Sequence, residues 1–165
     1  MDKGITIEQI QEATQLLKQY KIKPSFFIQF GYLGETREDI RLTIKMINHL
    51  LPHDIGISVS YPLPGTGFYE KVKQDLQQKS NWTDSDELAM LFRNTFQPAF
   101  YKQLHRYVHK TYRWHIALNS VKKLITHPVS ANFQLIKKAF SGLYYAPASV
   151  IDKIKLNQLA NTMTS

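Results

Sequence analysis

The feature that most constrains the fold is a pair of short apolar segments separated by one helical pattern. Residues 25–30 (SFFIQF) are bounded by Pro24 and Gly31 and are typical of a strand buried on both faces. Residues 55–61 (IGISVSY) predict a second strand with its apolar residues on one face. Between the strands, apolar residues recur at helical spacing at Ile40, Ile44, Ile47 and Leu51. Strands joined by a crossover helix of this length pair in parallel with a right-handed connection, so we expect part of an α/β sheet or barrel.

Amphipathic patterns predict helices on both sides of this unit. The first helix starts at Thr6, where Thr6 and Gln9 form a capping box, and Thr36 with Asp39 repeats that pattern before the crossover helix. Further helical patterns cover residues 68–77, 83–92, 100–125, 131–143 and 152–160. We therefore expect an α/β part with two parallel strands, followed by an all-helical extension. Two strands alone leave bare edges and an unfilled inner face, which indicates that part of the sheet is missing.

Each predicted strand is followed by a loop rich in glycine or proline. The first loop runs Gly31-Tyr32-Leu33-Gly34-Glu35-Thr36, and the second runs Pro62-Leu63-Pro64-Gly65-Thr66. Carboxyl ends of parallel strands share one edge of a sheet, where α/β folds bind ligands. Neither loop carries a dinucleotide or phosphate-binding fingerprint, so a glycine turn and a rigid turn without ligand are equally open interpretations. Four phenylalanines are core candidates, namely Phe26, Phe27, Phe30 and Phe68.

The net charge of +8 is concentrated in the second half of the chain. Residues 1–87 hold 10 Lys and Arg against 12 Asp and Glu, whereas residues 88–165 hold 11 against one acid, Asp152. This change predicts two regions, residues 1–80 and 81–165. The basic helix with its aromatic residues (Tyr101, Tyr107, Tyr112 and Trp114) can be read as a nucleic-acid surface, as a membrane surface, or as a helix packed against the missing part of the protein.

The chain contains no cysteine, which excludes disulfides, a thiolate zinc site, a cysteine nucleophile and a cysteine-held iron-sulfur cluster within this sequence. His105 and His109 lie one helical turn apart but lack an evident third metal ligand. No apolar run is long enough to span a bilayer, and the start of the sequence lacks the pattern of a signal peptide. A cytoplasmic protein is therefore expected.

Three segments in order resemble the carboxyl-terminal half of the radical S-adenosylmethionine (radical SAM) core, especially that of cobalamin-binding-type members. They are MDKGITIEQIQEA, FFIQFGYLGETREDI and ISVSYPLPGTGFYEKVK, and they cover a little under half of the chain. The resemblance implies a fragment of a partial (β/α)6 TIM-like barrel, with residues 25–30 as the fifth strand and 55–61 as the sixth. Met1 matches an interior methionine of the family, which implies an amino-terminal truncation.

The resemblance also implies a set of site residues and cofactors. In the family, a CxxxCxxC motif holds a [4Fe-4S] cluster that cleaves S-adenosylmethionine, and a small-molecule substrate reacts; cobalamin is used by some members. That motif is absent here. The residues that would approach the adenine are Phe30, Gly31, Gly34, Tyr61 and Pro62, while Glu35 would brace the first loop. Leu33 departs from the proline usual between the two glycines.

The leading hypothesis is a carboxyl-terminal fragment of a radical SAM protein that contributes the adenine side of the site and is not catalytically competent alone. Its partner would be the missing amino-terminal half or a complementing chain. The alternative is a basic helical module that binds nucleic acid or an acidic protein. A third interpretation is a fragment with no independent function.

Overall fold

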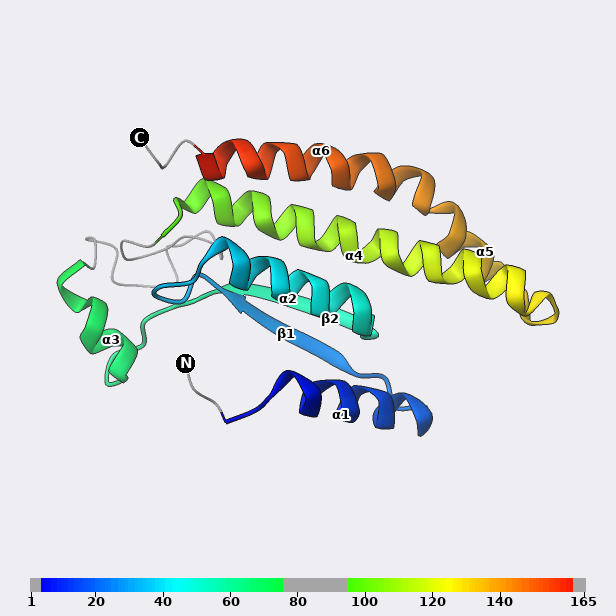
Figure 1. Cartoon of the computed structure of the whole chain (residues 1–165), viewed down its shortest axis with the longest axis horizontal. Helices are drawn as coiled ribbons and strands as arrows, with labels where there is room; N and C mark the ends of the chain where they lie inside the picture. The colour runs from blue at the N-terminus through cyan, green and yellow to red at the C-terminus, as the bar shows by residue number, and fades with distance from the viewer. Residues whose placement is uncertain (1–3, 76–94, 162–165) are drawn as a thin grey trace. The chain divides into compact units, whose positions relative to one another are not determined.

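A computed structural model of the chain describes residues 4–75 and 95–161. The chain divides into two compact units, one formed by residues 1–42 and 52–102 and the other by residues 43–51 and 103–165. The boundary predicted at residue 80, and the helix predicted at 83–92, lie outside the described residues. Figure 1 shows the order of the elements along the chain. We call the first unit the sheet unit and the second the helical unit.

The sheet unit is built on two parallel strands, β1 (Ser25–Phe30) and β2 (Asp54–Val59), which confirms the predicted pairing. Their register runs from Ser25 opposite Asp54 to Phe30 opposite Val59. The sheet is two-stranded among the described residues and does not close. The observed fold is therefore α/β with an open sheet, followed by a long helical region.

The helices of the sheet unit begin where the sequence predicts. Helix α1 (Ile7–Gln19) carries the Thr6–Gln9 capping box, with the Thr6 N–H donating to Gln9 Oε1 at 2.9 Å. Helix α2 (Arg37–Leu50) follows Thr36, and its first turns belong to this unit. Helix α3 (Gly67–Val72) gives way to the short 3-10 helix η1 (Lys73–Asp75), so the predicted helix over 68–77 tightens from residue 73, and its residues 76–77 lie outside the described residues.

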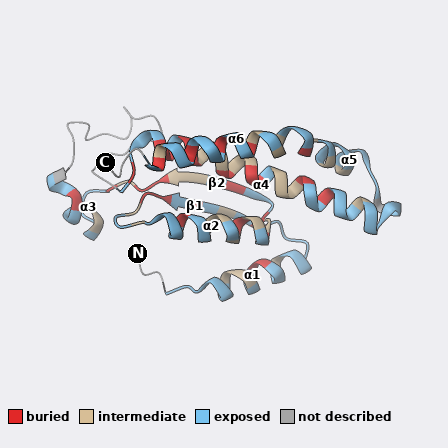
Figure 2. Cartoon of the chain, turned by 45° about the horizontal axis from the view of Figure 1, so that its top comes forward, coloured by how far each residue is buried: buried red, intermediate tan, exposed pale blue. Residues whose placement is uncertain are grey.

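Only one face of the strands is covered. Phe30 is 1% exposed and Ile28 is 8% exposed, and Ile55 and Val59 are buried on the same face. On the opposite face Phe27 is 77% exposed, so the prediction that β1 is buried on both faces, with Phe27 in the core, is wrong. The reason is the open sheet, which offers nothing to cover that face among the described residues. Figure 2 shows this contrast along the strands.

The core of the sheet unit is completed by aromatic residues at the start of helix α4 (Pro98–Thr126) and just before it. Phe96 and Phe100 stack with ring centroids 4.1 Å apart, and Tyr101 packs edge-on to Phe100 at 5.4 Å. All three side chains are buried. The first turn of α4 thus belongs to the sheet unit, and the remainder belongs to the helical unit.

The helical unit contains most of α4, the short 3-10 helix η3 (Pro128–Ser130), α5 (Phe133–Phe140) and α6 (Gly142–Asn161). Helices α4 and α6 run antiparallel, since Gln103 contacts Asp152 near one end and Trp114 approaches Gly142 near the other (Figure 1). The helix predicted over 131–143 ends earlier, at Phe140.

Helix α6 corrects a second prediction, because it runs unbroken through Pro147 where the sequence predicts a helix only over 152–160. Proline lacks the N–H that would bond the carbonyl four residues earlier. That carbonyl belongs to Leu143, which lies in the first turn and is 78% exposed, so water can hydrate it. The hydrogen bond lost at Pro147 therefore costs less free energy than it would in a buried helix interior.

The helical unit buries polar residues as well as apolar ones. The buried polar residues are Gln103, Thr111, Ser120, Ser149 and Asp152. Lys110 Nζ lies 2.7 Å from Asp152 Oδ2, and Gln103 Nε2 donates to the Asp152 carbonyl at 3.1 Å. Burial would raise the pKa of Asp152, but hydrogen bonds from Lys110 and Gln103 outweigh it and lower that pKa below its ordinary value. Of the helices described, none is long and apolar enough to cross a membrane.

Candidate functional site

The two strand-end loops begin side by side at one edge of the sheet. Phe30 is opposite Val59 in the parallel register, and the Ser60 N–H donates to the Phe30 carbonyl at 2.7 Å. Four of the predicted site residues, Phe30, Gly31, Tyr61 and Pro62, therefore lie at the same strand ends. We call this edge, with the two loops that leave it, the rim.

The first loop is closed by a hydrogen bond across its own span. The Glu35 carboxylate accepts the Gly31 N–H at 2.8 Å, and the Glu35 N–H donates to the Tyr32 carbonyl at 2.9 Å. Gly31 and Gly34 have φ values of 78° and 82°, in the left-handed region that favours glycine. A Cβ added to Gly34 would meet no atom within 4 Å, so the loop borders open space at that point.

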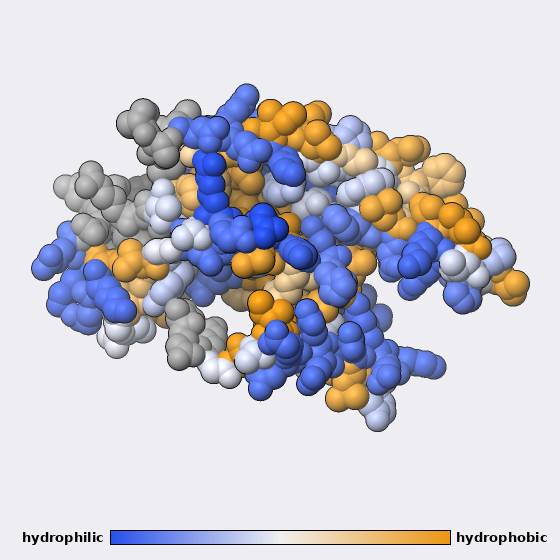
Figure 3. All heavy atoms as spheres, viewed as in Figure 1, coloured by the Kyte–Doolittle hydropathy of each residue, from blue (hydrophilic) through white to orange (hydrophobic). Residues whose placement is uncertain are grey.

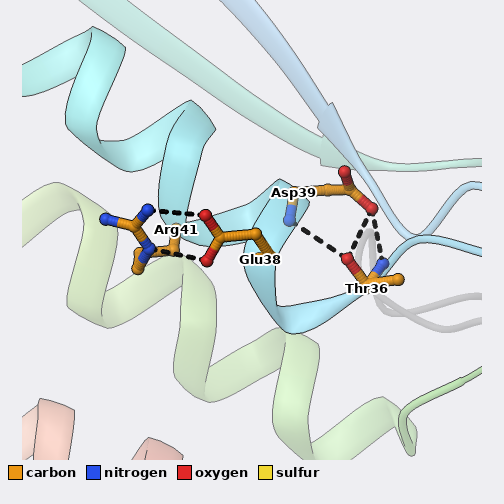
Figure 4. A network of polar contacts seen from close by, with 4 residues as sticks. All are labelled: Thr36, Glu38, Asp39 and Arg41. Atoms are coloured by element: carbon orange, nitrogen blue, oxygen red, sulfur yellow. Dashed lines mark hydrogen bonds and ion pairs between the residues drawn. The ribbon is translucent and has the colours of Figure 1, made fainter.

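The exit of this loop is fixed by the cap of α2 (Figure 4). The Thr36 N–H and hydroxyl both donate to Asp39 Oδ2, at 2.8 and 2.7 Å, and the Asp39 N–H donates back to the Thr36 hydroxyl at 3.2 Å. These bonds form the predicted capping box and lower the pKa of Asp39. Next to this cap, Glu38 of the first turn and Arg41 form two charged hydrogen bonds, at 2.5 and 2.7 Å, on the exposed side of the helix.

Aromatic rings connect the two loops. Tyr32 of the first loop stacks on Phe68 of α3, with ring centroids 4.9 Å apart. The hydroxyl of Thr66 caps α3 by accepting the Tyr69 N–H at 3.2 Å. Leu33 and Leu63 are 44% and 57% exposed, so each loop also presents an apolar side chain to solvent.

Glu35 is the titratable group that the rim perturbs most. Burial raises its pKa to about 7; the hydrogen bond from Gly31 opposes that rise, and the charge of Asp39 adds to it. Tyr101, which is 1% exposed, has its pKa raised by burial and by the charge of Glu35. The rim therefore contains a carboxyl group that can change protonation near neutral pH.

Two buried hydroxyls in the sheet unit are missing from the sequence-based site. Ser60 Oγ and Tyr101 Oη are both buried and have no hydrogen-bond partner within the described part of the chain. The serines that alternate with apolar residues in 55–61 were a usable signal for Ser60. For Tyr101 there was none, because no local pattern indicates that the first turn of α4 is buried within the sheet unit.

Helix α4 buries two of the four aromatic residues on which the nucleic-acid interpretation rests. Tyr101 and Tyr112 are 1% and 4% exposed and cannot stack on a base. Arg113 lies over the ring of Tyr145 at 5.7 Å from its centroid, which engages its guanidinium within the helical unit.

A metal site is not evident in the described ranges 4–75 and 95–161. The rings of His105 and His109 lie 4.5 Å apart, but no group of three or more His, Asp or Glu among these residues is placed to hold an ion.

A separate open groove of about 910 Å³ lies in the sheet unit between α1 and the segment leading into β1. Its lining is mainly apolar and includes Ile10, Leu17, Ile22 and Phe26. Because it lies near the start of β1, it is at the opposite end of the strand from the rim.

Comparison with known proteins adds no relative: no family model matches the sequence, and no curated protein matches it.

Proposed function

We propose that this chain is part of a radical SAM protein and that its rim contributes the adenine side of an S-adenosylmethionine site. The observation that carries the proposal is the pairing of the two strand ends, where the Ser60 N–H bonds to the Phe30 carbonyl and sets Gly31 beside Tyr61 and Pro62. The sequence resemblance supplies the family, and the geometry at the rim is compatible with it.

The chemistry of the rim suits the adenine part of S-adenosylmethionine. Adenine is a flat ring that binds between apolar surfaces and accepts hydrogen bonds from backbone groups. The Gly31 N–H already donates to Glu35, so we assign Gly31 and Gly34 to shaping the loop. The open space beside Gly34 and the half-buried ring of Tyr61 are the surfaces available to a ligand.

The residues present do not fit the family's other cofactor. A [4Fe-4S] cluster is held by cysteine thiolates, and this sequence has no cysteine. The proposal is therefore limited to binding, and the cluster ligands would come from residues outside this sequence or from a complementing chain. Nothing in the rim distinguishes a cobalamin-dependent parent from the others. The proposal keeps the cytoplasmic location expected from the sequence.

Binding can be measured by titrating S-adenosylmethionine, and separately 5'-deoxyadenosine, into the full chain by calorimetry. We expect both ligands to bind and the affinity to fall about tenfold or more in Gly34→Val, because a β-branched residue is strained at φ 82° and fills the open space. The matched control is Gly4→Val, which also replaces a glycine of positive φ with open space around it, but outside the rim.

The ligand titration tests whether an adenine site exists, and the Gly34→Val variant tests whether that site lies at the rim. If neither ligand binds at millimolar concentration, the adenine site is wrong. If both bind and Gly34→Val changes nothing, the site lies away from the rim.

A further inference from the structure

Helix α5 has more apolar side chains around its surface than the helical unit covers. Leu135 and Ala139 lie half-buried on one side of the helix. The neighbouring side carries Phe133, Ile136 and Phe140, which are 76%, 40% and 67% exposed. These three recur at helical spacing, so they share one face.

Exposed apolar residues also flank α5 in the sequence. Leu143, just after α5, is 78% exposed, and Val129, in η3 just before it, is fully exposed. Figure 3 shows hydrophobic side chains along α6, the next helix, with hydrophilic ones among them. An exposed apolar surface of this kind with a polar border marks an interaction site more often than a random surface does.

The charged residues of α5 and of the end of α4 have one sign. Lys137 borders the face of Phe133, Ile136 and Phe140, Lys138 lies on the other side of α5, and Lys122 and Lys123 lie near the end of α4. The only acid in residues 88–165 is Asp152, which is 5% exposed and paired with Lys110. We call Phe133, Ile136, Phe140 and Leu143, with Lys137 and Lys138, the α5 surface.

We propose that the α5 surface docks on the surface of an anionic lipid membrane, with α5 lying in the plane of the interface. A short helix with large apolar side chains on one face, a lysine at the border of that face and no acid is suited to the boundary between headgroups and acyl chains. Anionic headgroups supply the negative charge that the helical unit lacks around this face.

Other occupants fit the α5 surface less well. A second copy of the chain would bring the same lysines against Lys137 and Lys138, which would repel. Nucleic acid would satisfy the lysines but would leave the aliphatic side chains of Ile136 and Leu143 without a partner. A lipid surface takes both kinds of side chain at once.

The test is sedimentation of the full chain with vesicles of phosphatidylcholine alone or of phosphatidylcholine with phosphatidylserine. We expect binding to the anionic vesicles, with an affinity about tenfold or more above that for the neutral ones, and weaker binding at high salt. The double variant Phe133→Ser/Phe140→Ser should lower the affinity by about tenfold or more, because both rings would insert into the interface.

The control variants make the same kinds of substitution at exposed residues outside the α5 surface. Ile7→Ser removes an exposed apolar residue of α1 in the sheet unit, away from the rim, and should leave vesicle binding unchanged. Lys137→Glu/Lys138→Glu should abolish the preference for anionic vesicles, whereas Lys71→Glu on α3 should not. Circular dichroism of each variant checks that the fold is retained, which the exposure of these residues favours.

Three outcomes would overturn the proposal. The first is no binding to phosphatidylserine vesicles at low salt. The second is equal binding by the wild type and the double phenylalanine variant. The third is that the wild type binds single-stranded RNA in a salt-dependent way but does not bind vesicles, and that the double phenylalanine variant binds the RNA equally well. This result would assign the lysines to nucleic acid.

Discussion

The sheet unit and the helical unit both bury apolar side chains, but they differ in what accompanies them. In the sheet unit, aromatic residues such as Phe30 and Phe100 form much of the buried part. The helical unit buries aliphatic residues such as Leu104, and polar residues such as Ser149 and Asp152 are buried with them. The difference teaches that the first unit depends mainly on apolar volume, whereas the second adds close helix approach and one paired charge to it.

The largest effect is expected from removing volume in the sheet unit. Phe30→Ala should lower the free energy of unfolding by about 3–5 kcal/mol, because the ring is fully buried. Phe27→Ala, three residues earlier on the uncovered face, should cost less than about 1 kcal/mol. Urea denaturation followed by circular dichroism measures both. Equal losses would show that the open face is covered in solution.

The next effect concerns the paired charge of the helical unit. Asp152→Ala should cost about 2–3 kcal/mol, because it leaves Lys110 partly buried without a counter-ion. Since the pKa of Asp152 is lowered in the folded state, its contribution is present above its ordinary pKa and is lost as the pH falls through the folded value.

The control for this pair is Lys153→Ala, which removes an exposed lysine of the same helix and should leave stability within about 0.5 kcal/mol of the wild type. In addition, Lys110→Met should offset part of the loss in a double variant with Asp152→Ala. Additive losses would mean that the two side chains do not interact.

Close helix approach gives the third prediction. A Cβ at Gly142 would lie 2.9 Å from Trp114 Cζ3 and 3.1 Å from Ala117 Cβ, so Gly142→Ala should destabilise the protein by about 1–2 kcal/mol. Gly67→Ala at the start of α3 meets no atom within 4 Å and should be neutral or slightly stabilising. Thermal unfolding of the two variants compares them directly, and a neutral Gly142→Ala would indicate looser packing of α4 on α6.

The smallest effect is the pH response of the rim. Because the pKa of Glu35 is raised to about 7, the folded state binds an extra proton between its ordinary pKa and 7, and stability should fall as the pH rises through that window. Allowing for partial exposure, the fall is about 1 kcal/mol. Glu35→Gln should flatten this part of the profile, measured by urea midpoints between pH 5 and about 8. Glu38→Gln, at an exposed ion pair, should not, and a parallel response of both variants would contradict the assignment.

The elements that depend on local pattern were predictable. Strand β1, the parallel pairing and both capping boxes follow from residue order and spacing, because hydrogen bonds and side-chain period act within a few residues. Strand β2 ends at Val59 rather than at Tyr61, because β1 turns away at Gly31 and the Ser60 N–H makes the last bond to it. The adenine-site assignment stays a prediction that rests on the resemblance.

The sequence by itself determined an α/β start with two parallel strands, a basic helical second half, and the absence of any cysteine that could hold an iron-sulfur cluster. Only the tertiary structure decided that Phe27 is exposed, that Tyr101 lies near Glu35, that α6 continues through Pro147, and that α5 leaves an apolar face uncovered. The physical reason is that burial depends on what packs against a face. Residue spacing shows which side chains share a face, but it does not show which other part of the structure covers that face.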